Sequence, residues 1–210
     1  MLGASVALLL AGCVPAAVTR SPAPTAASPT TSSPTPTADD LVSVVITSSG
    51  LELHTDDAVT ATWDYDAIDD AAVAGLSAAF GFEPAVATGS TPCEGGTCAV
   101  TSWTWEGLEL KVLDTATVVG PGFVTVTAPT VGDVPITAAD GSAVGDDAEP
   151  IIAANGEGLE ELDEYGIVWV GRTPVENAER EDAFRAVSVI LDAERDRVSQ
   201  IGAPSANYGM

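Results

Sequence analysis

The stretch AVTSWTWEGLELKVL, Ala99–Leu113, is the part of the sequence that decides the fold. Side chains alternate on both sides of Glu106-Gly107, and a two-residue turn that ends in glycine is typical of a β-hairpin. Because neighbouring residues of a strand face opposite ways, Trp103 and Trp105 share one face of the first arm. One face of the second arm carries Leu108, Leu110 and Val112.

Further strands are predicted on both sides of this hairpin, from short runs of β-branched or alternating apolar residues. These runs are Leu41–Thr47, Leu51–Leu53, Val59–Tyr65, Gly122–Ala128, Val134–Ala138, Tyr165–Arg172, Phe184–Leu191 and Arg197–Ile201. A helix is predicted from Asp66 or Asp69 to Phe80, with Gly81 as its C-terminal cap, and a shorter helix ends at Ala154. The sequence therefore predicts an α+β domain: mainly antiparallel β-sheet of short strands, with one amphipathic helix and one shorter helix.

The charge of the chain is strongly negative, with 31 acidic and 7 basic side chains and a net charge of −24. Such a surface repels nucleic acid and anionic lipid headgroups, so neither is predicted as a partner. It would attract cations or a basic protein. Solubility and mutual repulsion explain the same composition without any partner.

The N-terminus holds a short apolar run, Leu2–Leu10, followed by two small residues and Cys13. The run is too short for a bilayer, which needs about 20 residues, but it matches the ~7–15-residue core of a signal peptide. Signal peptides begin with Lys or Arg, whereas the first basic residue here is Arg20. The natural start is therefore predicted to lie upstream of Met1.

The segment Leu8–Cys13 resembles the lipobox of bacterial lipoproteins. In that family the signal peptidase cuts before the cysteine, whose thiol carries a diacylglyceryl anchor. The resemblance implies a signal peptide over residues 1–12 and a lipid anchor of the palmitate type on Cys13. Two acyl chains give the stable membrane attachment that one chain cannot give.

Residues 14–38 are rich in Pro, Thr, Ser and Ala and carry one charge, Arg20. This composition predicts a disordered tether, since it cannot bury enough apolar surface to offset backbone ordering. Residues 39–210 then form a single extracytoplasmic domain. The lipobox, the Pro/Thr/Ser stalk and the acidic domain together resemble the exported lipoproteins of high-GC Gram-positive (actinobacterial) bacteria. That resemblance implies a lipid-anchored protein of the cell envelope, on the outer face of the cytoplasmic membrane.

Lipidation of Cys13 would leave two cysteines, Cys93 and Cys98, which bracket Glu94–Thr97. An even pair in an oxidising compartment predicts a structural disulfide. The spacing is not Cys-x-x-Cys, and no second pair or histidine stands nearby to complete a zinc site.

Catalytic motifs are missing from the sequence: it contains no Gly-x-Ser-x-Gly, phosphate loop or His-Glu-x-x-His, and His54 is its one histidine. The chain is therefore predicted to be non-catalytic and to use no soluble cofactor. A cell-wall hydrolase with two carboxylates remains an alternative, because 31 acidic residues give no reason to choose a pair.

Four aspartates, Asp64, Asp66, Asp69 and Asp70, crowd the predicted junction between a strand and a helix. Carboxylate oxygens suit calcium, so one hypothesis is a calcium-responsive envelope domain with these residues as ligands. The pattern is not an EF-hand loop, since the sixth position is Asp69 and the twelfth is Gly75. The alternative is that the aspartates cap the helix, whose N-terminus favours negative charge.

Tryptophans are the remaining candidates for a binding surface. Trp103 and Trp105 on one hairpin face could meet a sugar or a protein, although burial in the core is the commoner role of such residues. From these observations we expect a lipid-anchored domain that binds or scaffolds in the cell envelope, with an envelope protein or a cell-wall component as its partner.

Overall fold

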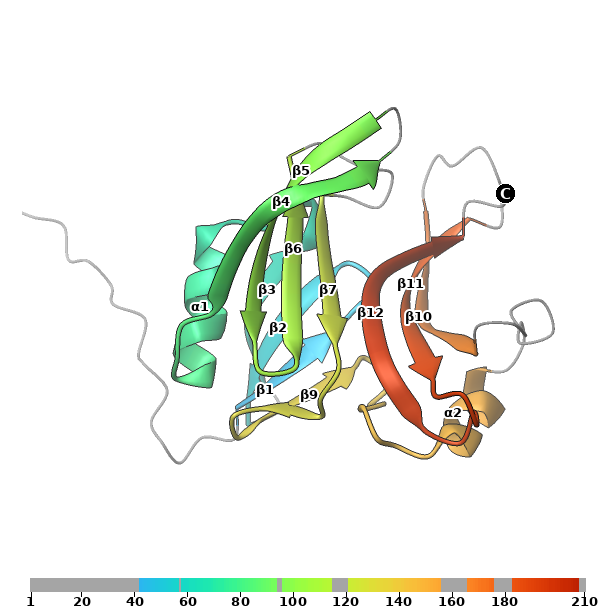
Figure 1. Cartoon of the computed structure of the whole chain (residues 1–210). Coiled ribbons are helices and arrows are strands. Elements are labelled where there is room, and N and C mark those ends of the chain that lie inside the picture. The colour runs from blue at the N-terminus through green and yellow to red at the C-terminus, as the bar shows by residue number, and fades with distance from the viewer. Residues whose placement is uncertain are drawn as a thin grey trace, which may run out of the picture. The chain divides into compact units, whose positions relative to one another are not determined.

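Two β-sheets pack face to face around one apolar core (Figure 1). The structure is a computed structural model, and it describes residues 42–56, 58–93, 96–114, 121–155, 166–175 and 183–207. These residues belong to one compact unit, Pro36–Met210. The predicted signal peptide, Cys13 and the Pro/Thr/Ser tether lie outside the described residues.

The smaller sheet has five strands in the order β3-β2-β1-β9-β8. Their bounds are β1 Val42–Ile46, β2 Gly50–Thr55, β3 Ala58–Asp64, β8 Thr130–Val131 and β9 Val134–Ala138. The pairs are antiparallel except for β1 and β9, which run parallel with Val44 opposite Ile136. The chain thus returns to its first strand after about 90 residues, and this long-range pair joins strands β1–β3 to strands β8 and β9 in one sheet.

The larger sheet has seven strands in the order β10-β11-β12-β7-β6-β5-β4, and every pair in it is antiparallel. Their bounds are β4 Ala85–Cys93, β5 Gly96–Trp105, β6 Leu108–Leu113, β7 Gly122–Val126, β10 Ile167–Pro174, β11 Phe184–Leu191 and β12 Val198–Asn207. The predicted hairpin is β5–β6, with Trp105 opposite Leu108 across the turn.

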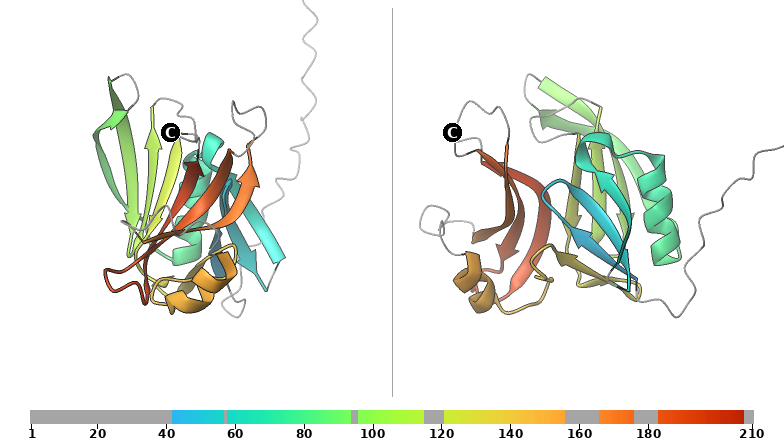
Figure 2. Two further views of the ribbon diagram at one scale, coloured as in Figure 1. Left: turned by 90° about the vertical axis from the view of Figure 1, so that its right-hand side faces the viewer. Right: turned by 180° about the vertical axis from the view of Figure 1, so that it is seen from behind.

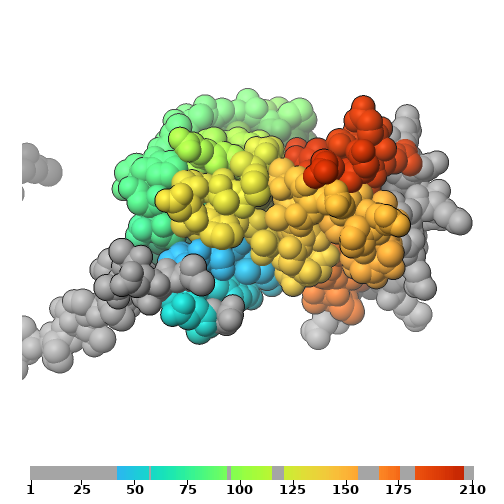
Figure 3. All heavy atoms as spheres, turned by 90° about the horizontal axis from the view of Figure 1, so that it is seen from below, coloured from blue at the N-terminus to red at the C-terminus, as the bar shows by residue number. Residues whose placement is uncertain are grey.

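The helices lie at the margins of the sheets (Figure 2), and each of them adds buried side chains to the core. A short 3₁₀ helix, η1 (Tyr65–Ala67), leads from β3 into α1 (Asp70–Phe80). The N-cap of α1 is Asp69, and Gly81 ends the helix in the left-handed conformation with φ 80°. The second helix is α2 (Ala148–Asn155). In the view from below, the surfaces of β9 (yellow) and α2 (orange) both lie on the face toward the viewer (Figure 3).

The core combines side chains from both sheets with the inner face of α1. The largest fully buried ones are Trp105, Tyr65, Ile46, Leu51, Leu76, Leu108, Leu110, Ile136 and Ile201. The predicted α+β class, mainly antiparallel sheet with one longer and one shorter helix, is confirmed. Within the described ranges, neither helix is long and apolar enough to cross a membrane.

Tyr65 is completely buried, and its hydroxyl has no hydrogen-bond partner among the described residues. Burial raises the pKa of this phenol well above its ordinary value, because the phenolate cannot be solvated in the core. The unfolded chain releases this proton near pH 10 and the folded chain only at higher pH, so stability falls as the pH rises above about 10.

Tyr65→Phe should therefore leave the free energy of unfolding unchanged or slightly higher at pH 8, since it removes an unsatisfied buried hydroxyl. Above pH 10 the variant should lose less stability than the native chain. Urea unfolding at pH 8 and pH 11 measures both differences. An equal alkaline loss in the two proteins would show that Tyr65 does not control it.

Candidate functional site

A groove with a volume of about 530 Å³ runs along the outer side of α1 and into the turn that follows it. Its lining includes Asp70, Val73, Ala74, Ala78, Phe82 and Glu83. Residues three and four apart in a helix lie on one face, so these positions form a single stripe along α1. Ala74 and Ala78 in this stripe are exposed, whereas Val73 is partly buried and packs against the core. Figure 1 shows α1 at the margin of the two sheets.

The groove is mostly apolar along α1 and has an acidic residue at each end. The apolar lining is interrupted by Ser77, a buried residue whose hydroxyl has no hydrogen-bond partner among the described residues. Val73, Ala74 and Ala78 form its floor, and Phe82, which is 36% exposed, closes one end of it. Asp70 is the first residue of α1, and Glu83 lies three residues beyond its last residue, Phe80.

The opposite face of α1 fixes the groove in place. Leu76 is fully buried, and the ring of Phe80 meets that of Trp105 edge-on with 5.7 Å between the centroids. The indole of Trp63, from β3, lies directly against Gly75, the residue before Leu76. Since the helix is held by side chains from both sheets, the groove has its shape before any partner binds.

Three of the four aspartates of the calcium hypothesis have partners within the chain, two of them local and one distant in sequence. Oδ1 of Asp64 accepts from the N–H of Asp66 at 2.8 Å, and Oδ1 of Asp69 caps α1 by accepting from Ala71 at 2.9 Å. A carboxylate oxygen of Asp66 lies 3.2 Å from Nη1 of Arg185 on β11. Asp70, the fourth aspartate, lines the groove along α1.

Across the described part of the chain, no three His, Cys, Asp or Glu side chains are grouped as a metal ion would require. The calcium hypothesis stays a prediction, and a rise in unfolding temperature specific to calcium over sodium at equal ionic strength would support it.

The two hairpin tryptophans do not form an exposed pair, which corrects the hypothesis of a Trp103/Trp105 platform. Trp105 is 1% exposed and belongs to the core, while Trp103 is half-buried and packs against that core. The shared face was predicted correctly, but it is the face that the second sheet and α1 cover.

A different aromatic pair, Trp169 on β10 and Phe184 on β11, lies edge-to-face at 5.1 Å between centroids. The guanidinium of Arg172 stands over both rings, 5.9 Å from the first centroid and 5.0 Å from the second. Because a cation of the same chain already covers these rings, they do not offer an open platform to a sugar.

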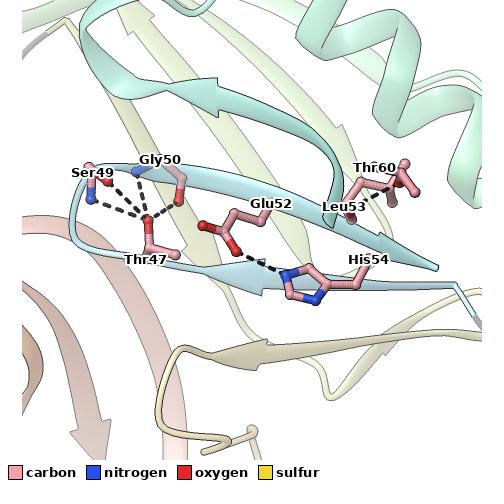
Figure 4. A network of polar contacts seen from close by, with 7 residues as sticks. All are labelled: Thr47, Ser49, Gly50, Glu52, Leu53, His54 and Thr60. Atoms are coloured by element: carbon pink, nitrogen blue, oxygen red, sulfur yellow. Dashed lines mark hydrogen bonds and ion pairs between the residues drawn. The ribbon is translucent and has the colours of Figure 1, made fainter. Parts of the chain in front are cut away.

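His54 lies on β2 and contacts Glu52, two residues earlier on the same strand, at 2.9 Å between Nε2 and Oε2 (Figure 4). Among the described residues no hydroxyl or thiol is hydrogen-bonded to this imidazole. Figure 4 also shows Thr47, whose hydroxyl donates to the carbonyl of Gly50 and holds the β1–β2 turn. The hydroxyl of Thr47 also accepts from the N–H of Gly50 at 3.0 Å, so these contacts stabilise the β1–β2 hairpin.

Cys93 and Cys98 are joined by a disulfide, with 5.8 Å between their Cα atoms. It links the end of β4 to the start of β5, where Cys93 lies opposite Gly96. The covalent link thus holds the tip of this hairpin closed.

The sequence singled out two lining residues of the groove, Gly81 as the helix cap and Asp70 as either a calcium ligand or a capping residue. Phe82 and Glu83 were missed, although their position directly after the helix-ending Gly81 was a usable signal. In comparisons with protein-family models, curated proteins and solved structures, nothing matches this chain.

Proposed function

We propose that this protein is a lipid-anchored, non-catalytic binding domain of the cell envelope that takes a basic partner in the groove along α1. The observation that carries the proposal is the groove itself, with an apolar floor and a carboxylate at each end. The domain would act by holding a partner near the membrane, and no step of covalent chemistry is assigned to it.

The anchor part of the proposal rests on the lipobox-like segment Leu8–Cys13. A diacylglyceryl group on Cys13 would place the domain on the outer face of the cytoplasmic membrane. Cell fractionation tests this directly: Cys13→Ser should move the protein out of the membrane fraction, whereas retention there would exclude anchoring through this thiol.

The charge of the partner follows from electrostatics. A chain with a net charge of −24 attracts positively charged proteins over several ångströms and repels acidic ones. Asp70 and Glu83 concentrate that attraction at the two ends of the groove, while Val73 and Ala78 offer a surface for apolar side chains between them. The arrangement suits a short segment with an apolar centre and Lys or Arg at both ends.

The test uses the full-length chain and a fluorescent probe peptide of sequence Lys-Lys-Leu-Val-Leu-Lys-Lys with blocked ends. Asp70→Asn combined with Glu83→Gln should weaken its binding about tenfold, because two exposed charge pairs, each contributing up to about 1 kcal/mol, are lost. The control is Glu149→Gln combined with Glu194→Gln, which makes the same change in net charge at exposed sites outside the groove.

The control pair should leave affinity within about twofold of the native value, since distant exposed charges are screened by salt. Equal weakening by both pairs would mean that the peptide responds to net charge alone. No measurable binding to the native chain would also contradict the proposal.

A further inference from the structure

The edges of the two sheets differ in how they are protected against a further strand. Within the described residues the sheets end at β3, β8, β10 and β4. The pairing at β3 has an irregularity beside Leu53, the pairing at β10 has one between Val170 and Thr173, and β8 spans two residues only. Bulges and short strands are the usual means by which proteins block edge-to-edge pairing.

The edge at β4 has none of these blocks along most of its length. Its pairing with β5 is unbroken from Ala85, opposite Thr104, to Cys93, opposite Gly96. The sequence AVATGSTPC contains no charged residue, and most of its side chains are exposed on both faces of the sheet, including Val86 at 61%. A long, regular and uncharged edge is a ready template for an added strand.

The backbone groups that β4 offers can be identified from its neighbour. The N–H of Ala99 donates to Oδ1 of Asp114 and its carbonyl accepts from the N–H of Asp114, each at 3.0 Å. Both groups of Ala99 therefore point away from β4, so Ala99 and its partner Ser90 form a pair without mutual hydrogen bonds. By alternation, Ser90, Thr88 and Val86 direct their N–H and C=O groups to the open edge.

Proline in the strand agrees with this assignment. Pro92 is the next residue of the same alternating set, and its nitrogen, which has no hydrogen, is tolerated where the N–H would face outward. The Cys93–Cys98 disulfide closes the hairpin just beyond it, which keeps β4 extended before anything binds. A rigid, preformed edge loses less conformational entropy on binding than a flexible one.

We propose that β4 accepts an extended segment of a basic protein partner as an additional β-strand, through the main-chain groups of Val86, Thr88 and Ser90. Strand addition of this kind takes its affinity from main-chain hydrogen bonds and its selectivity from flanking contacts. One flank here is acidic, since Glu83 stands two residues before the strand. The net charge of −24 disfavours a second copy of this chain at the same edge.

This inference adds a contact to the proposed function but does not depend on the groove along α1. The decisive variant is Thr88→Pro, which removes an outward N–H without breaking a hydrogen bond to β5. Its matched control is Thr88→Val, which keeps the N–H and favours a strand. The probe is a labelled peptide, Lys-Thr-Lys-Val-Lys-Thr-Lys with blocked ends, titrated into the full-length chain.

Thr88→Pro should weaken binding of this peptide about tenfold, whereas Thr88→Val should change it less than twofold. A second peptide of the same sequence, N-methylated at alternate residues, keeps every charge but cannot complete the ladder, and it should bind about tenfold more weakly. Equal binding of the two peptides, or no effect of Thr88→Pro, would overturn strand addition.

The outcomes separate this inference from the groove. Binding that survives Thr88→Pro but is lost with the Asp70 and Glu83 changes would refute the added strand and leave the proposed function standing. Analytical ultracentrifugation of the native chain without peptide tests whether a second copy of the chain binds the β4 edge instead. A dimer that Thr88→Pro converts to monomer would assign the edge to a second copy and refute the basic partner.

Discussion

Replacing Trp105 by alanine should lower the free energy of unfolding by about 3–5 kcal/mol, the range typical of large aromatic side chains removed from a core. Trp105 is 1% exposed and lies between β5 and α1, where its ring meets that of Phe80. The loss combines the transfer of the indole with the cavity that it leaves, and it loosens the helix that carries the groove.

Urea unfolding followed by circular dichroism measures this change. The control is Thr104→Ala on the same strand, whose side chain is exposed and whose loss should stay within about 0.5 kcal/mol. A comparable effect of the two substitutions would mean that Trp105 does not occupy the core position described above.

Gly50→Ala should destabilise the fold by about 3 kcal/mol, at the upper end of the costs measured for overpacking. A Cβ at this position would overlap the carbonyl oxygen of Trp63 and lie 2.9 Å from its carbonyl carbon. Because the obstacle is backbone of the paired strand β3, no side-chain rotation can relieve it.

Gly89→Ala is the matched control, since a Cβ there meets only one atom of Val100 at 3.9 Å. This second change should be neutral or raise stability by about 0.5 kcal/mol, because alanine loses less conformational freedom in a strand. Thermal or urea unfolding of both variants decides the question, and equal stability of the two would contradict the close approach of β2 to β3.

Local patterns predicted the parts of this fold that depend on neighbouring residues. The alternation around Glu106-Gly107 identified β5 and β6, since turn and strand signals agree within fifteen residues. Gly81 marked the end of α1, and Asp69 was one of two predicted N-caps beside Asp66, because both caps are formed by the chain next to the helix.

The missed elements depend on distant parts of the chain. β4 has little apolar alternation, contains Gly89 and Pro92, and exists as a strand because β5 offers it a partner. The pairing of β1 with β9 joins residues about 90 positions apart, and no local signal specifies a parallel register.

The candidate site was harder to predict than the fold for a related reason. The sequence does not distinguish a carboxylate that caps a helix from one that pairs with a cation or lines a groove. In the structure Asp69 caps α1, Asp66 pairs with Arg185 and Asp70 lines the groove. The tryptophans carried the same ambiguity: the pattern showed that Trp103 and Trp105 share a face, and only the position of α1 decides that this face is covered.

If a basic partner binds the groove along α1, a map of where the probe peptide binds will show it. Backbone amide shifts of the ¹⁵N-labelled full-length chain, recorded during titration with Lys-Lys-Leu-Val-Leu-Lys-Lys, supply that map. We expect saturable shifts that concentrate at Val73, Ala74 and Ala78 on the groove floor. Shifts that spread evenly over exposed acidic sites such as Glu149 and Glu194, without saturation, would contradict it.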